Sequence, residues 1–141
     1  MKQMSSQLTR EYWTYLQDQV ESHEQAYFQA TNDHAYRDEL RASAETYDWL
    51  AKEFSLAFST EGGQTAEGTR EFLNLLDQKI QHFVSAQEQT RRKKQAALAK
   101  APAVEYHPIR RMYQEMENRL GCELTAYRDS REHFLSILVE G

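Results

Sequence analysis

The chain has 141 residues, a formal net charge of −5 and a single cysteine, Cys122. This length suits one compact domain over residues 1–141, and one cysteine excludes an internal disulfide. No apolar stretch approaches the roughly 20 residues that a membrane span needs, and the start lacks the apolar run of a secretory signal. We therefore expect a cytoplasmic protein that does not enter membranes. Glycine and proline are scarce, and abundant Gln, Glu, Ala, Leu and Arg predict an all-α fold.

The first half of the chain predicts one helical hairpin, over about residues 6–60. A helix over about 6–30 carries a stripe at steps of three and four, formed by Leu8, Tyr12, Leu16, Val20, His23 and Tyr27. Asp33 is a good N-cap for the next helix, which we expect over about 34–58. Its stripe comprises Tyr36, Leu40, Ser43, Tyr47, Leu50, Phe54 and Ala57. Gly62 then suits the left-handed conformation that ends a helix.

The second half predicts another hairpin, over about residues 66–139. The third helix should span about 66–99, with a stripe of Phe72, Leu73, Leu76, Ile80, Phe83, Val84 and Gln87. The stripe fades after Gln87, so we expect this end to project past the core. The fourth helix should span about 108–139, with Pro108 in its first turn, and Gly121 weakens it locally. Its buried side should comprise Ile109, Tyr113, Met116, Leu120, Leu124, Tyr127, Phe134 and Leu138.

Four helices joined by short breaks predict a four-helix antiparallel bundle. A match at an offset of 60, "TREYWTYL" from Thr9 against "TREFLNLL" from Thr69, suggests two tandem helical hairpins. Amphipathic helices of similar composition also look alike by chance, so duplication and coincidence both stay open. In either case we expect the apolar stripes to pack the helices side by side and leave no interior room for reactive groups.

Motifs for catalysis and metal binding are missing from the sequence. Di-metal bundles use inward-facing Glu-x-x-His pairs, which do not occur here, and Asp129 with His133 is a weak substitute. No Walker loop, dinucleotide fingerprint or Ser-centred elbow is present. A buried histidine bonded to a tyrosine explains His23, and a small packing residue explains Cys122. We therefore expect no enzymatic activity, no metal and no cofactor.

Charge is distributed unevenly along the chain. Residues 91–111 hold seven cations against the single acid Glu105, so they carry +6 and leave −11 of the total on the rest. An antiparallel bundle brings these residues together at one end, as a basic patch of Arg91, Arg92, Lys93, Lys94, Lys100, Arg110 and Arg111. The patch is either a solvated helix extension or a site for a phosphate, a nucleic acid or an acidic protein. The acidic remainder disfavours nucleic acid.

Aromatic residues off the stripes form a second surface feature, comprising Trp13, Tyr15, Phe28, Trp49 and Phe58. Such wide apolar arcs are typical of a partner surface or of helices central to a bundle. The leading hypothesis is a non-enzymatic protein–protein interaction module, which binds another protein or a second copy of itself through these faces. Its role would be that of an adaptor, a regulator or an assembly factor. The alternative is a nucleic-acid- or phosphate-binding protein that uses the basic patch.

Overall fold

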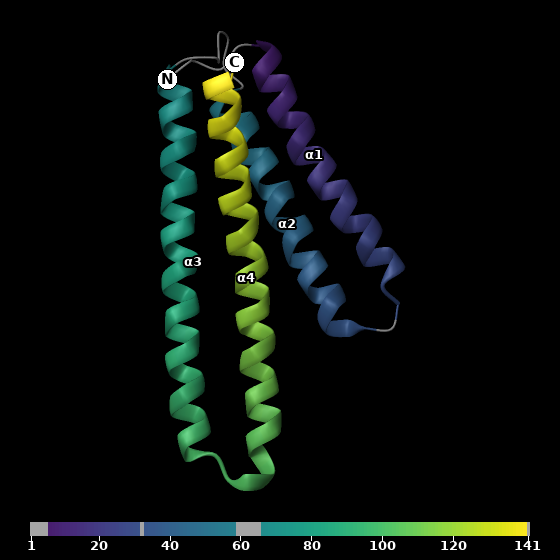
Figure 1. Cartoon of the computed structure of the whole chain (residues 1–141), viewed down its shortest axis with the longest axis vertical. Coiled ribbons are helices and arrows are strands. Elements are labelled where there is room, and N and C mark those ends of the chain that lie inside the picture. Colours follow the sequence, from purple (N-terminus) through teal and green to yellow (C-terminus); the bar gives the residue numbers. More distant parts are fainter. Residues whose placement is uncertain (1–5, 32, 59–65, 141) are drawn as a thin grey trace.

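The structure, a computed structural model, describes residues 6–31, 33–58 and 66–140, and within these ranges it contains four α-helices and no strand. The helices are α1 (Ser6–Gln29), α2 (His34–Ala57), α3 (Ala66–Lys100) and α4 (Ala103–Glu140). The predicted all-α four-helix bundle is confirmed. Helices α1 and α2 form one antiparallel hairpin, and α3 and α4 form a second, longer one (Figure 1).

Local capping explains where α2 begins. The Asp33 carboxylate accepts a hydrogen bond from the backbone N–H of Tyr36 at 3.0 Å, as the sequence predicts for an N-cap. At the other end, the N–H of Phe58 bonds to the carbonyl of Phe54 at 3.1 Å. The predicted stop at Gly62 lies outside the described residues.

Helix α4 begins five residues before the predicted start, so placing Pro108 in its first turn is wrong. The first turn instead forms at Ala103, where the N–H of Glu105 bonds to the carbonyl of Pro102 at 2.9 Å. A proline inside a helix removes one backbone donor, here the one that would reach the carbonyl of Val104. Val104 is 87% exposed, so water can take that bond and the helix continues through the proline.

The core lies at one end of the bundle, which we call the closed end, where α1 and α3 begin and α2 and α4 finish (Figure 1). The largest fully buried side chains come from all four helices: Tyr12, Leu16, Leu50, Phe54, Phe72, Leu76, Phe134 and Leu138. The aromatic rings among them meet edge to face, with centroid separations of 4.8 Å for Tyr12–Phe54 and 5.1 Å for Phe72–Phe134. The buried Tyr12 hydroxyl donates to the carbonyl of Ser130 at 3.1 Å, which ties α1 to α4.

The two hairpins separate toward the opposite end, which we call the open end. Helix α1 diverges from α4, and the α3–α4 hairpin projects beyond the α1–α2 hairpin, as the fading stripe predicts (Figure 1). No described side chain is buried between residues 21 and 39, and none is buried between 91 and 123. The predicted burial of Tyr36 and Met116, which lie in these two stretches, is therefore wrong. The predicted burial of Val84, midway along α3, is wrong as well, because its side chain is exposed.

The repeat at an offset of 60 corresponds to matching positions in the core. Tyr12 and Phe72 are both buried, as are Leu16 and Leu76. A duplicated hairpin predicts this match, and two amphipathic helices that enter one core at the same end also require it.

Candidate functional site

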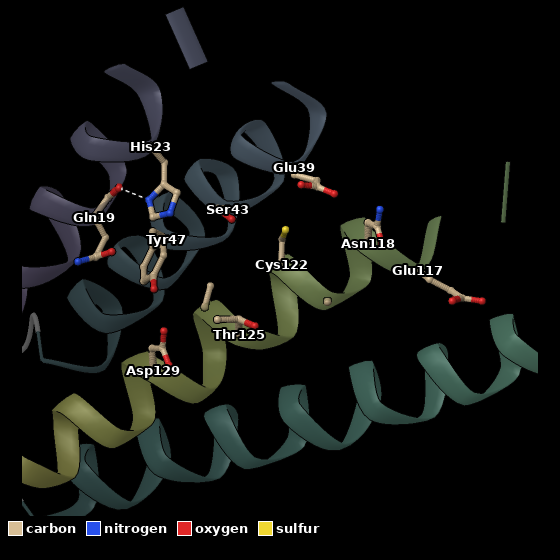
Figure 2. A pocket seen from close by; sticks show the side chains of 12 residues that line it. Gln19, His23, Glu39, Ser43, Tyr47, Glu117, Asn118, Cys122, Thr125 and Asp129 are labelled. Atoms are coloured by element: carbon tan, nitrogen blue, oxygen red, sulfur yellow. Dashed lines mark hydrogen bonds between the residues drawn. The ribbon is translucent and has the colours of Figure 1, made fainter. Parts of the chain in front are cut away.

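The separation of the hairpins leaves a groove with α2 as its floor and α1 and α4 as its walls (Figure 2). Helix α2 contributes Glu39, Ser43 and Tyr47 at steps of four, and α1 contributes Gln19 and His23. Helix α4 presents one face at steps of three and four: Asn118, Gly121, Cys122, Thr125, Ala126 and Asp129. The expectation that the stripes leave no room between the helices is therefore wrong at the open end.

The groove holds about 460 Å³ and continues toward the end of the α3–α4 hairpin. A second hollow of about 220 Å³ shares Glu39 and Asn118 with the first and is lined further along by Met112 and Met116 of α4. The groove thus changes along its length, from Asp129 at its closed-end side to two exposed methionines at its open-end side.

Cys122 of α4 and His23 of α1 both line the groove. Burial raises the pKa of the Cys122 thiol, and the charge of Glu39 adds to this, so the thiol stays protonated and is a poor nucleophile near neutral pH. His23 is half-buried and stacks on Tyr47 with 5.4 Å between ring centroids. Its Nδ1 donates to the carbonyl of Gln19 at 2.7 Å, so a backbone group, not the predicted tyrosine hydroxyl, is its hydrogen-bond partner.

Carboxylates in the groove do not assemble a metal site. Among the residues that the structure describes, no group of three or more His, Cys, Asp or Glu side chains suits a metal ion. Glu117 pairs with Lys94 of α3 at 3.5 Å, whereas Glu39 and Asp129 have no ion-pair partner within the described ranges. His133, four residues after Asp129, stacks on Tyr15 with centroids 3.9 Å apart.

The five aromatic candidates do not share one surface. Phe58 is buried in the core, and Tyr15 and Trp49 are partly buried against it, with the Trp49 ring also under Lys79 at 4.7 Å. Only Trp13 and Phe28, both on α1, are exposed. The packing of the other three side chains in or against the core therefore explains why they are apolar, without a partner surface.

The basic patch, in contrast, does assemble at the tip of the α3–α4 hairpin, as the antiparallel arrangement predicts. Arg91 and Arg92 share Glu88, and Lys94 pairs with Glu117. The other four cations of the patch have no ion-pair partner in the part of the chain that the structure describes: Lys93, Lys100, Arg110 and Arg111.

Sequence reasoning missed the groove itself. Its signal was present as small or polar residues at stripe spacing, with Ser43 inside the α2 stripe and Gly121 and Cys122 inside α4. Small side chains at such positions leave space, but they also allow close helix packing, so their spacing alone did not distinguish the two.

None of the described helices combines the length and the apolar character of a membrane span. No protein family, no curated protein and no solved structure matches this chain.

Proposed function

We propose that this chain is a non-enzymatic protein–protein interaction module that acts as an adaptor, a regulator or an assembly factor and holds its partner at the open end. The observation that carries this proposal is the α3–α4 hairpin between residues 91 and 123, which has no buried side chain. Helices gain most of their stability in proteins by packing an apolar face, so an uncovered hairpin of this length favours a partner.

Exposed apolar side chains support the same location. The structure describes nine large hydrophobic side chains that are exposed, and six of them lie in the two stretches without buried side chains, 21–39 and 91–123. These six are Phe28 and Tyr36 beside the α1–α2 turn, and Val104, Tyr106, Met112 and Met116 on α4. Methionine is common on binding surfaces because its flexible side chain adapts to a partner. The proposed surface therefore keeps Phe28 from the sequence prediction and adds the methionine face of α4.

Affinity capture from the native cell, with partners identified by mass spectrometry, tests this proposal. The double variant Met112→Glu, Met116→Glu should weaken capture of a specific partner by more than about tenfold, or ~1.4 kcal/mol. Val84→Glu, an exposed apolar position on α3, is the matched control and should retain the partner. Trp13→Gln, at an exposed position of α1, tests by the same capture experiment whether that side of α1 contacts the partner. Identical partners captured by wild type and the methionine variant would contradict the proposal.

A second candidate is binding of a nucleic acid or another phosphate polymer at the tip. It is favoured by the four cations that have no ion pair among the described residues. The informative variant changes Lys93, Lys100, Arg110 and Arg111 to Gln, because Arg91, Arg92 and Lys94 already have acidic partners. Fluorescence anisotropy with a labelled duplex should then show salt-sensitive binding that this variant loses. Absence of binding by the wild type at low salt removes this candidate.

A further inference from the structure

Two surfaces of this chain carry opposite charge and lie at different levels along α4. The tip presents Lys93, Lys100, Arg110 and Arg111 without ion pairs among the described residues, and the groove presents Glu39 and Asp129 in the same condition. Arg110 and Asp129 lie on the same straight helix, 19 residues and therefore about 28 Å apart. Arg110 therefore cannot reach Asp129 of its own chain, whereas a second molecule can supply a partner for each.

We propose that the groove receives the α3–α4 hairpin tip of a second copy of this chain, so that two copies pair in antiparallel orientation with tip cations facing groove carboxylates. This inference rests on the proposed interaction function and names its partner. A twofold arrangement makes the same contact twice, with each tip in the other copy's groove, and it closes the assembly as a dimer.

Charge over the whole chain favours this pairing. The tip carries +6 in residues 91–111, and the remainder carries −11 of the total of −5. Two such dipolar molecules attract in the antiparallel orientation, which brings each tip beside the acidic part of the other copy. An external polyanion would meet the same acidic remainder and be repelled by it, which is why a second copy fits better than a nucleic acid.

The apolar side chains fit the same arrangement. Val104 is 87% exposed at the tip, and Met112 and Met116 line the open-end side of the groove. When the tip of one copy enters the other copy's groove from the open end, it covers Met112 and Met116 of that groove. The tip's arginines then lie near Glu39 of the same groove. The hollow of about 460 Å³ admits a few side chains but not a whole helix, so we expect the tip to insert side chains into the groove while its helices rest on the rim.

A charge-swap experiment tests the proposal with full-length chains. The tip variant is Arg110→Glu, Arg111→Glu, and the groove variant is Glu39→Lys, Asp129→Lys. Sedimentation velocity should show a wild-type dimer that dissociates as salt rises, and each variant alone should bind itself at least about tenfold more weakly. An equimolar mixture of the two variants should restore a dimer, because every tip then meets a groove of opposite charge. Circular dichroism melting curves confirm that both variants fold.

Cross-linking then locates the contact, because Cys122 is the only cysteine and lies in the groove. In Val104→Cys, the two thiols of one copy lie about 27 Å apart along α4, so a disulfide between positions 104 and 122 must join two copies. Mild oxidation should form this bond in Val104→Cys. Leu56→Cys is the control that should not pair with Cys122, because this exposed position lies about 20 Å along α2 from Ser43, which lines the groove.

Three results would overturn the proposal: a wild-type chain that stays monomeric at low salt, a variant mixture that forms no dimer, or a monomer that binds duplex DNA through Arg110 and Arg111. A monomeric chain whose methionine variant still loses its captured partner would leave the interaction function standing and remove only the second copy as that partner.

Discussion

The two ends of this bundle use similar helices in opposite ways. At the closed end, Tyr12, Phe54, Phe72 and Phe134 interlock in a core that excludes water. At the open end, aromatic and methionine side chains of comparable size stay exposed, and polar contacts hold the chain together. A helical stripe thus identifies the face that a helix can bury, whereas neighbouring helices determine how far along that face burial extends.

Truncating a core ring should give the largest contrast between the ends. Phe134 is fully buried, and its ring centroid lies 5.1 Å from those of both Tyr12 and Phe72. Phe134→Ala should lower the free energy of unfolding by about 3–5 kcal/mol, because it removes buried apolar surface and leaves a cavity. Met112→Ala at the open end should change it by no more than about 0.5 kcal/mol. Urea denaturation followed by circular dichroism measures both, and similar losses would contradict a core confined to the closed end.

Alkaline pH should weaken the same core. Burial raises the pKa of Tyr12 well above its ordinary value, with the neighbouring Tyr15 adding to the shift, and burial likewise raises the pKa of Tyr15, Tyr47 and Tyr127. The folded chain keeps these protons where the unfolded chain releases them, above a pH of about 10. Stability is therefore fully present below that pH and falls above it, by up to ~1.4 kcal/mol per pH unit for Tyr12 alone.

Denaturation curves at increasing pH measure this loss, and Tyr12→Phe isolates the contribution of one hydroxyl. The variant should be about 1 kcal/mol less stable at neutral pH, since it loses the hydrogen bond to the Ser130 carbonyl, and its stability should fall less steeply with pH. An unchanged slope would mean that Tyr12 is not shielded from water.

A smaller effect than that of the core ring, and of opposite sign, should come from the groove face of α4. A methyl group added at Gly121 would meet only the flexible end of Gln87, with Nε2 at 3.5 Å, which is ordinary contact. Gly121→Ala should raise the free energy of unfolding by ~0.5–1 kcal/mol, because glycine is a poor residue for a helix interior. Thermal denaturation measures the gain, and amide exchange between residues 113 and 123 should slow. A destabilised variant would show that Gln87 cannot give way.

Much of the fold was predictable because its determinants are local. The helical periodicity, the Asp33 cap and the fading of the α3 stripe after Gln87 are all written in neighbouring residues, and the structure confirms each. The predictions failed where residues far apart in the sequence determine which side chains are buried and which hydrogen bonds form. The acceptor of the Tyr12 hydroxyl lies 118 positions away, and the exposure of Tyr36 depends on the direction in which the whole α1–α2 hairpin leaves α4.

The candidate site divides in the same way. The basic patch followed from charge spacing and antiparallel topology, so the sequence located it correctly at one tip. The groove depends on the angle between two hairpins, which no stripe encodes. Phe58 and Trp49 show the opposite error. They lie off the predicted stripe, yet they pack in or against the core because α2 has neighbouring helices on more than one side.

The far end of the α1–α2 hairpin is held chiefly through Tyr27. The Arg37 guanidinium stacks 4.3 Å from the Tyr27 ring centroid and donates to its carbonyl at 3.4 Å, and Arg41 donates to its hydroxyl. Both arginines thus use one aromatic side chain, through cation–π contacts and hydrogen bonds, and no residue of the hydrophobic core takes part. The two ends of the α1–α2 hairpin are therefore held by different forces: contacts of one tyrosine with two arginines at the far end, and buried aromatic packing at the near end.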